Sequence, residues 1–112
     1  MAATDSLDTL LSAITSATQD ADFAAAKFAA VKIAAIASTE RSWLQSHAAA
    51  ACYQSSYDSA VASYVDLSAT AKAISDDADA GRAGAIRNGV AKARSDLSAL
   101  KRAGTKAISA CA

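Results

Sequence analysis

Two cysteines, Cys52 and Cys111, have the clearest chemical potential in this chain of 112 residues. They lie almost symmetrically about Gly81, the first glycine of a chain that contains no proline. If the chain turns back at Gly81 as a helical hairpin, both thiols reach the same end, where a disulfide needs Cα atoms within about 7 Å of each other. Such a bridge would close a long loop, contribute about 4 kcal/mol in the chain-entropy model and indicate an oxidising compartment. Two unrelated thiols in a reducing compartment are the alternative.

The remaining candidates for chemistry do not form a recognisable site. His47 is the only histidine, and its spacing of five residues from Cys52 splays the two side chains apart on a helix. The chain has no CxxC, HxxxH or HExxH motif and no GxSxG nucleophile elbow. Residues 77–81 have too few carboxylates for a calcium loop and fit a helix end and turn instead. We therefore predict no catalytic residues, no metal site and no cofactor, and a protein that is not an enzyme.

Composition predicts the elements that position these residues. Alanine, the strongest helix former, supplies roughly three residues in ten, and no stretch alternates as a strand does. Interruptions near residues 39–41 and 79–82 predict an all-α, antiparallel bundle of three long helices in a single domain, residues 1–112. A break near Thr18 would give four helices. Residues 42–45 read as a capping box that opens the second helix, with Trp43 entering the core.

Apolar residues recur with a seven-residue period, which is typical of left-handed bundle packing. The clearest stripe follows Gly81 and consists of Ile86, Val90, Ala93, Leu97, Leu100, Gly104, Ala107 and Cys111. On the preceding segment, Tyr53, Tyr57 and Tyr64 belong to a similar stripe. We interpret these tyrosines as core residues with hydroxyl groups at the rim, although they could also line a groove.

Charge is unevenly distributed although the formal net charge is zero. Residues 1–81 carry ten acidic and four basic side chains, whereas residues 82–112 carry seven basic side chains and one acid. Arg87, Arg94 and Lys101 repeat every seven residues beside the apolar stripe, so we expect them to flank a helix interface and pair with acids of a neighbouring helix. With Arg102 they could instead form a basic interaction face for phosphate groups.

No apolar run approaches the roughly 20 residues of a membrane-spanning helix, and the first residues lack the charged and apolar regions of a signal peptide. An exported protein would therefore be a mature form without its signal peptide, or would leave the cell by a signal-independent route.

Residues 42–111 resemble small exported helical proteins and lipoproteins of actinobacteria. The resemblance rests on Ser42-Trp-Leu-Gln, Cys52-Tyr53, the run Asp79-Ala-Gly-Arg-Ala-Gly-Ala-Ile and Cys111. The chain also resembles the WXG family of secreted helical hairpins in length and in the placing of a tryptophan. Leu44 and Gln45 follow Trp43, however, so the glycine of that motif is absent.

Together these observations predict a non-enzymatic helical bundle, secreted or on the cell surface, stapled between Cys52 and Cys111. We expect it to act as a binding or structural module, with a protein partner or self-association. The alternative is an intracellular nucleic-acid-binding or regulatory module that uses the basic C-terminal helix.

Overall fold

The computed structural model describes residues 2–47 and 50–110. These residues form four α-helices and one short 3₁₀ turn: α1 (Ala2–Gln19), α2 (Phe23–Gln45), η1 (Ala51–Tyr53), α3 (Gln54–Asp79) and α4 (Ala83–Ala110). The predicted all-α bundle is confirmed. Within the described ranges, no helix is long and apolar enough to span a lipid bilayer.

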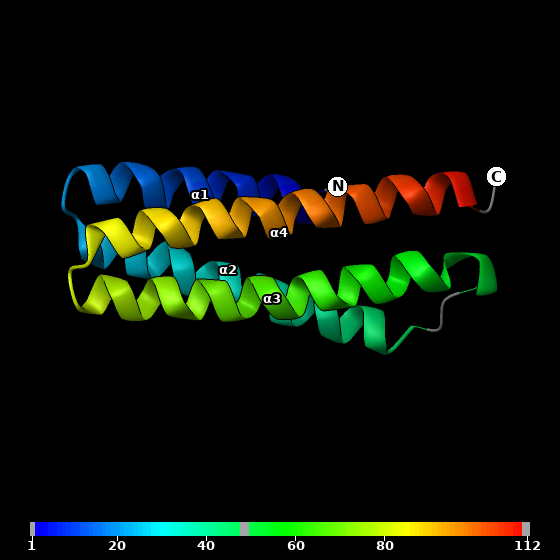
Figure 1. Ribbon diagram of the computed structural model, residues 1–112. Helices are drawn as coiled ribbons and strands as arrows, with labels where there is room; N and C mark the ends of the chain where they lie inside the picture. The colour runs from blue at the N-terminus through cyan, green and yellow to red at the C-terminus, as the bar shows by residue number, and fades with distance from the viewer. Residues whose placement is uncertain (1, 48–49, 111–112) are drawn as a thin grey trace.

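The helices form an elongated antiparallel bundle with dimensions of 47 × 22 × 20 Å (Figure 1). The helices α2 and α4 each pack against both α1 and α3, so the four helices occupy the corners of a square. At 1.5 Å per residue, the 18 residues of α1 span about 27 Å and the 28 residues of α4 about 42 Å. The start of α1 therefore lies near the middle of the bundle, and the far ends of α3 and α4 extend beyond it (Figure 1).

The expected single long helix over the first segment is wrong, because the chain turns between α1 and α2. Ala21 has a left-handed backbone (φ 54°), and Asp22 N–H donates to the Ala17 carbonyl at 2.8 Å, which closes a Schellman turn. Asp22 then accepts a hydrogen bond from Ala25 N–H at 3.1 Å and caps α2. The alternative with a break near Thr18 is the correct one.

The turn between α3 and α4 has the same geometry, and here the predicted break is confirmed. Gly81 has φ 65°, and Arg82 N–H donates to the Asp77 carbonyl at 2.9 Å. A glycine reaches this backbone region without the steric penalty of a Cβ atom, so the sequence signal is direct. At the α1–α2 turn an alanine takes the same role, and the sequence offers no such signal.

The expected break near residues 39–41 is wrong. The helix α2 continues to Gln45, because the polar residues from Ser38 to Ser42 lie on its solvent-facing and half-buried positions and do not interrupt its hydrogen bonds. Residues 42–45 form the last turn of α2 and do not open a new helix. Trp43 is consequently 56% exposed and does not enter the core.

The core follows the predicted stripes. In α4 the stripe from Ile86 to Leu100 is buried, whereas Gly104 and Ala107 are half-buried where α1 no longer covers them. The tyrosine stripe of α3 is only partly buried: Tyr64 is 2% exposed and Tyr53 is 39% exposed. Seven large side chains are fully buried: Leu7, Leu11, Ile14, Ile33, Leu67, Ile74 and Ile86.

Candidate functional site: an aromatic pocket beyond α1

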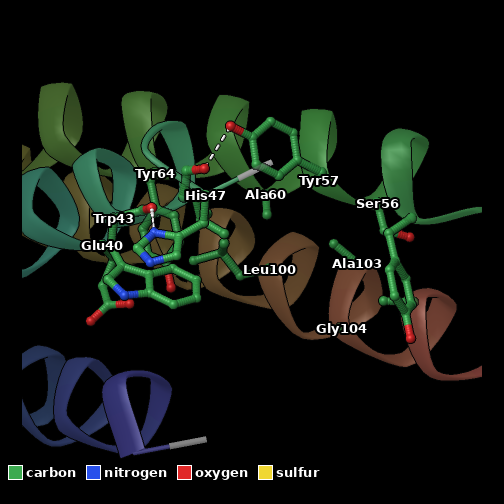
Figure 2. A pocket seen from close by; sticks show the side chains of 13 residues that line it. Glu40, Trp43, His47, Ser56, Tyr57, Ala60, Tyr64, Leu100, Ala103 and Gly104 are labelled. Carbon is green, nitrogen blue, oxygen red and sulfur yellow. Dashed lines mark hydrogen bonds between the residues drawn. The ribbon is translucent and has the colours of Figure 1, made fainter. Parts of the chain in front are cut away.

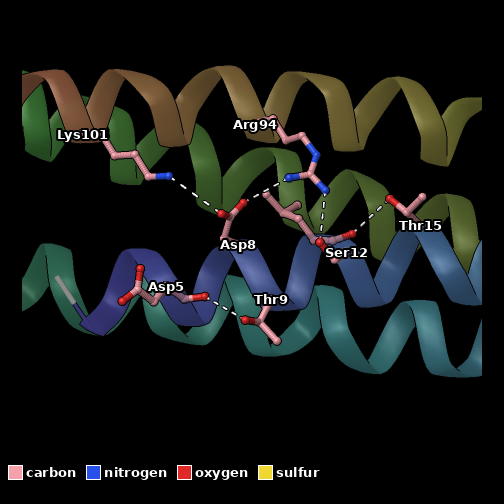
Figure 3. Close-up of polar contacts among 8 residues, drawn as sticks. Asp5, Asp8, Thr9, Ser12, Thr15, Arg94 and Lys101 are labelled. Carbon is pink, nitrogen blue, oxygen red and sulfur yellow. Dashed lines mark hydrogen bonds and ion pairs between the residues drawn. The ribbon is translucent and has the colours of Figure 1, made fainter.

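Half of the predicted basic face is already paired within the bundle. Arg94 Nη1 donates to Asp8 Oδ1 at 3.1 Å, and Lys101 Nζ lies 3.9 Å from Asp8 Oδ2 (Figure 3). Arg87 and Arg102 are exposed. The expected pairing of α4 bases with an acid of a neighbouring helix is therefore seen for Arg94 and Lys101, and the basic residues do not form one continuous free surface.

The predicted disulfide involves a residue that the structure does not describe. Cys52 lies in η1 and is exposed, and η1 packs against α4. Cys111 follows the last residue of α4 and lies outside the described residues. The structure thus places Cys52 at the end of the bundle where α4 ends, and the Cys52–Cys111 bridge stays a prediction.

An apolar pocket of about 390 Å³ lies where the bundle changes from four helices to three (Figure 2). The helices α2, α3, α4 and the turn η1 form it, and no described residue of α1 lines it. Its lining combines aromatic rings with small residues on α3 and α4: Glu40, Trp43, Leu44, His47, Tyr53, Ser56, Tyr57, Ala60, Tyr64, Leu100, Ala103, Gly104 and Ala107.

Trp43 and His47, one helical turn apart at the end of α2, form one wall of the pocket. Their rings stack with centroids 4.0 Å apart and planes inclined by 18°. His47 Nδ1 lies 2.6 Å from the Trp43 carbonyl oxygen. Because a carbonyl only accepts hydrogen bonds, Nδ1 carries the proton, and in the neutral ring Nε2 is left as an acceptor. The hydrogen bond also fixes the imidazole against the indole.

Tyr57 joins the end of α2 to α3 beside the pocket. Its hydroxyl group donates at 2.7 Å to the Leu44 carbonyl in the last turn of α2, which also accepts the backbone N–H of His47 at 3.2 Å (Figure 2). This contact holds the wall formed by Trp43 and His47 at a fixed distance from α3. The Tyr57 hydroxyl has a structural partner before any ligand enters.

Glu40 and Tyr64 lie at the inner end of the pocket. Burial raises the pKa of Tyr64 above its usual value of 10.0, and the negative charge of Glu40 raises it further. Glu40 is half-buried, and the described residues include no ion-pair partner for it. The pocket thus holds one carboxylate within an otherwise apolar and aromatic lining.

Two polar groups of this site already have hydrogen-bond partners in the backbone. His47 Nδ1 and the Tyr57 hydroxyl are engaged with backbone carbonyls. In the described ranges, no cluster of three or more His, Cys, Asp or Glu side chains could hold a metal ion. A ligand would meet ring faces, a floor of small residues, the Glu40 carboxylate, His47 Nε2 and the hydroxyl groups of the lining.

Sequence reasoning found this site only in part. It identified the three tyrosines as groove candidates but assigned them to the core. It missed Glu40 and Trp43, because it placed the first in a loop and the second inside a new helix. The useful signal was the spacing of Glu40, Trp43 and Leu44 by three or four residues, which puts these residues on one side of a continuous helix, with His47 just beyond its end.

No protein-family model matches the chain, and neither a curated protein nor a solved structure shows significant similarity to it. The resemblance to exported actinobacterial helical proteins therefore stays a prediction from residues 42–111.

Proposed function

We propose that this protein is a non-enzymatic binding module, exported or at the cell surface, whose ligand site is the aromatic pocket beyond the start of α1. One observation carries the proposal: about 390 Å³ of mostly apolar space, lined by four aromatic side chains, lies open beside the core. This volume is in the range of small-molecule sites, which are typically apolar clefts with a few polar groups.

The exposed indole of Trp43 supports this proposal. A side chain of this size would bury 150–250 Å² in a core, at about 25 cal/mol per Å², yet Trp43 is 56% exposed. Its orientation is nevertheless fixed by the stack on His47. A rigid aromatic wall beside a floor of Ala60, Ala103 and Gly104 offers a ligand apolar contact at little cost in conformational entropy.

The competing nucleic-acid module has less support from the arrangement of charges. All four residues of the predicted basic face are exposed, but Asp8 engages Arg94 and Lys101, and only Arg87 and Arg102 lie outside the ion pairs seen among the described residues. A salt titration with random duplex DNA separates the two functions. Affinity that falls steeply as salt rises would favour the nucleic-acid module.

The pocket is tested by titration with N-phenylnaphthylamine, a neutral apolar dye, followed by dye emission and by quenching of Trp43, the only tryptophan. A leucine at Gly104 would occupy the floor, because a Cβ atom there meets no other atom within 4 Å. Gly84→Leu is the matched control: it makes the same exchange on α4, also without a contact within 4 Å, at about 30 Å from Gly104 along the helix.

Wild-type protein and Gly84→Leu should bind the dye equally, and Gly104→Leu should bind at least tenfold more weakly. Equal binding by all three proteins, or no binding by the wild type, would contradict the proposal. The exported location is tested separately by counting free thiols in denatured, unreduced protein. No free thiol at monomeric mass supports the Cys52–Cys111 bridge, and two free thiols after oxidising production exclude it.

A further inference from the structure

The charge inside the pocket restricts the class of ligand. Glu40 is the one acidic residue of the lining, and the ion pairs formed by the described residues do not include it. A neutral ligand that filled the pocket would remove water from this carboxylate without replacing the lost interactions, which is unfavourable. A cationic ligand would replace the water with an ion pair.

No lysine or arginine is among the described residues that line the pocket with Glu40. Lys101, on the adjoining part of α4, is directed to Asp8 of α1. Arg41, the next residue of α2, lines a different groove, between α2 and α3. Helix ends of both signs lie around the pocket, the C-terminal ends of α2 and α4 and the N-terminal ends of α1 and α3, so their dipoles partly offset each other. The full charge of Glu40 therefore sets the sign of the site.

The aromatic rings favour the same sign. The faces of Trp43, Tyr57 and Tyr64 carry the negative part of the ring quadrupole, which attracts an ammonium group and repels an anion. The Tyr64 hydroxyl is protonated at neutral pH and adds no charge. Carboxylate and ring faces together form a cation-selective environment on one side of the pocket, and the small residues of α3 and α4 form an apolar space on the other.

We propose that the pocket binds an organic cation, an ammonium group that carries an apolar or aromatic body. Glu40 is the counter-charge, Trp43 presents a ring face to the ammonium group, and the body lies over Ala60, Ala103 and Gly104. This inference rests on the proposed binding function and adds the chemical class of the ligand to it.

The test compares two probes of one shape, benzyltrimethylammonium and its uncharged carbon analogue neopentylbenzene, by titration calorimetry and by quenching of Trp43. The wild-type protein should bind the cation at least tenfold more tightly than the neutral probe. Glu40→Gln should remove that preference: its affinity for the cation should be about tenfold lower, and its affinity for the neutral probe unchanged or higher. Asp58→Asn is the matched control, because Asp58 is an exposed acid near the same end of the bundle and does not line the pocket.

The outcomes separate this inference from the binding function. If both probes bind wild-type protein with equal affinity, the cation preference is wrong and the apolar pocket stands. If neither probe binds, both proposals fail. The ligand-free protein could also sediment as a dimer. If the cation neither binds this dimer nor dissociates it, a second copy of the chain covers the pocket and the inference is overturned. The comparison of the two probes on wild-type protein needs no variant, so it stands even if Glu40→Gln folds poorly.

Discussion

The two Schellman turns at one end of the bundle provide a reciprocal test of backbone strain. Ala21 and Gly81 hold equivalent positions, with φ 54° and 65°, and each turn is closed by the same pair of backbone hydrogen bonds. The residue in the left-handed position differs: alanine in one turn and glycine in the other. Exchanging the two types, as Ala21→Gly and Gly81→Ala, should therefore change stability in opposite directions.

The magnitude follows from two opposing terms. An L-residue in the left-handed region costs about 1–2 kcal/mol, and replacing it with glycine removes this penalty. The added glycine makes the unfolded chain more flexible, which returns about 0.4–1 kcal/mol. We expect Ala21→Gly to raise the free energy of unfolding by roughly 0.5–1 kcal/mol. Gly81→Ala should lower it by a similar amount, because its Cβ atom would lie 3.7 Å from the Phe23 ring, an ordinary contact.

The assay is urea unfolding followed by far-ultraviolet circular dichroism, with the dependence on urea concentration checked for two-state behaviour. Ala13→Gly is the matched control, since Ala13 is exposed inside α1. There the same exchange should destabilise the protein by about 1 kcal/mol. If Ala21→Gly lowers stability as Ala13→Gly does, Ala21 is not strained, and the proposed equivalence of the two turns is wrong.

Two further predictions concern the core and the pocket. Gly89→Ala would place a Cβ atom 2.6 Å from Ile74 Cγ1, whereas the Cβ atom of Gly104→Ala would meet no atom within 4 Å. Because of overpacking, the first variant should be about 1–3 kcal/mol less stable than the second in the same urea assay. Equal stabilities would show that α3 and α4 can separate freely. The pKa of Tyr64 is raised by burial and by Glu40. Above pH 10 the unfolded state therefore loses the phenol proton before the folded state does. The free energy of unfolding then falls as pH rises, by up to about 1.4 kcal/mol per pH unit. Below pH 10, Tyr64 contributes no pH dependence to the free energy of unfolding. Tyr64→Phe should remove the fall above pH 10, as unfolding curves between neutral and alkaline pH will show. An unchanged alkaline slope in that variant would contradict the raised pKa of Tyr64.

The sequence by itself determined the class of fold and most of the core. A high alanine content and the absence of alternating segments were enough for an all-α bundle. The seven-residue stripe of α4 predicted its buried face, from Ile86 to Leu100, because one side of each helix must face the others. Gly81 predicted a turn, because glycine is the residue that enters the left-handed region at no steric cost.

Other local sequence signals were misleading, because the structure at those positions depends on contacts between residues distant in the sequence. The turn at Ala21 has no glycine to indicate it, so the break near Thr18 was only an alternative, and the packing of α1 against α2 and α4 compensates for the strain. The polar run from Ser38 to Ser42 reads as a loop, yet it is the exposed surface of a continuous helix. Spacing predicted that α4 bases would pair with acids of a neighbouring helix, but only the bundle identifies Asp8 as the partner.

The pocket belongs entirely to the tertiary structure. The described part of α1 spans about 15 Å less than α4, and none of its residues lines the pocket. On their separate helices, Glu40, Trp43 and Tyr64 do not form a site. The packing of α2 against α3 brings them together around the pocket. Periodicity specifies which face of a helix is buried. Which neighbouring helices cover that face along its length is decided by how the helices are arranged in the bundle.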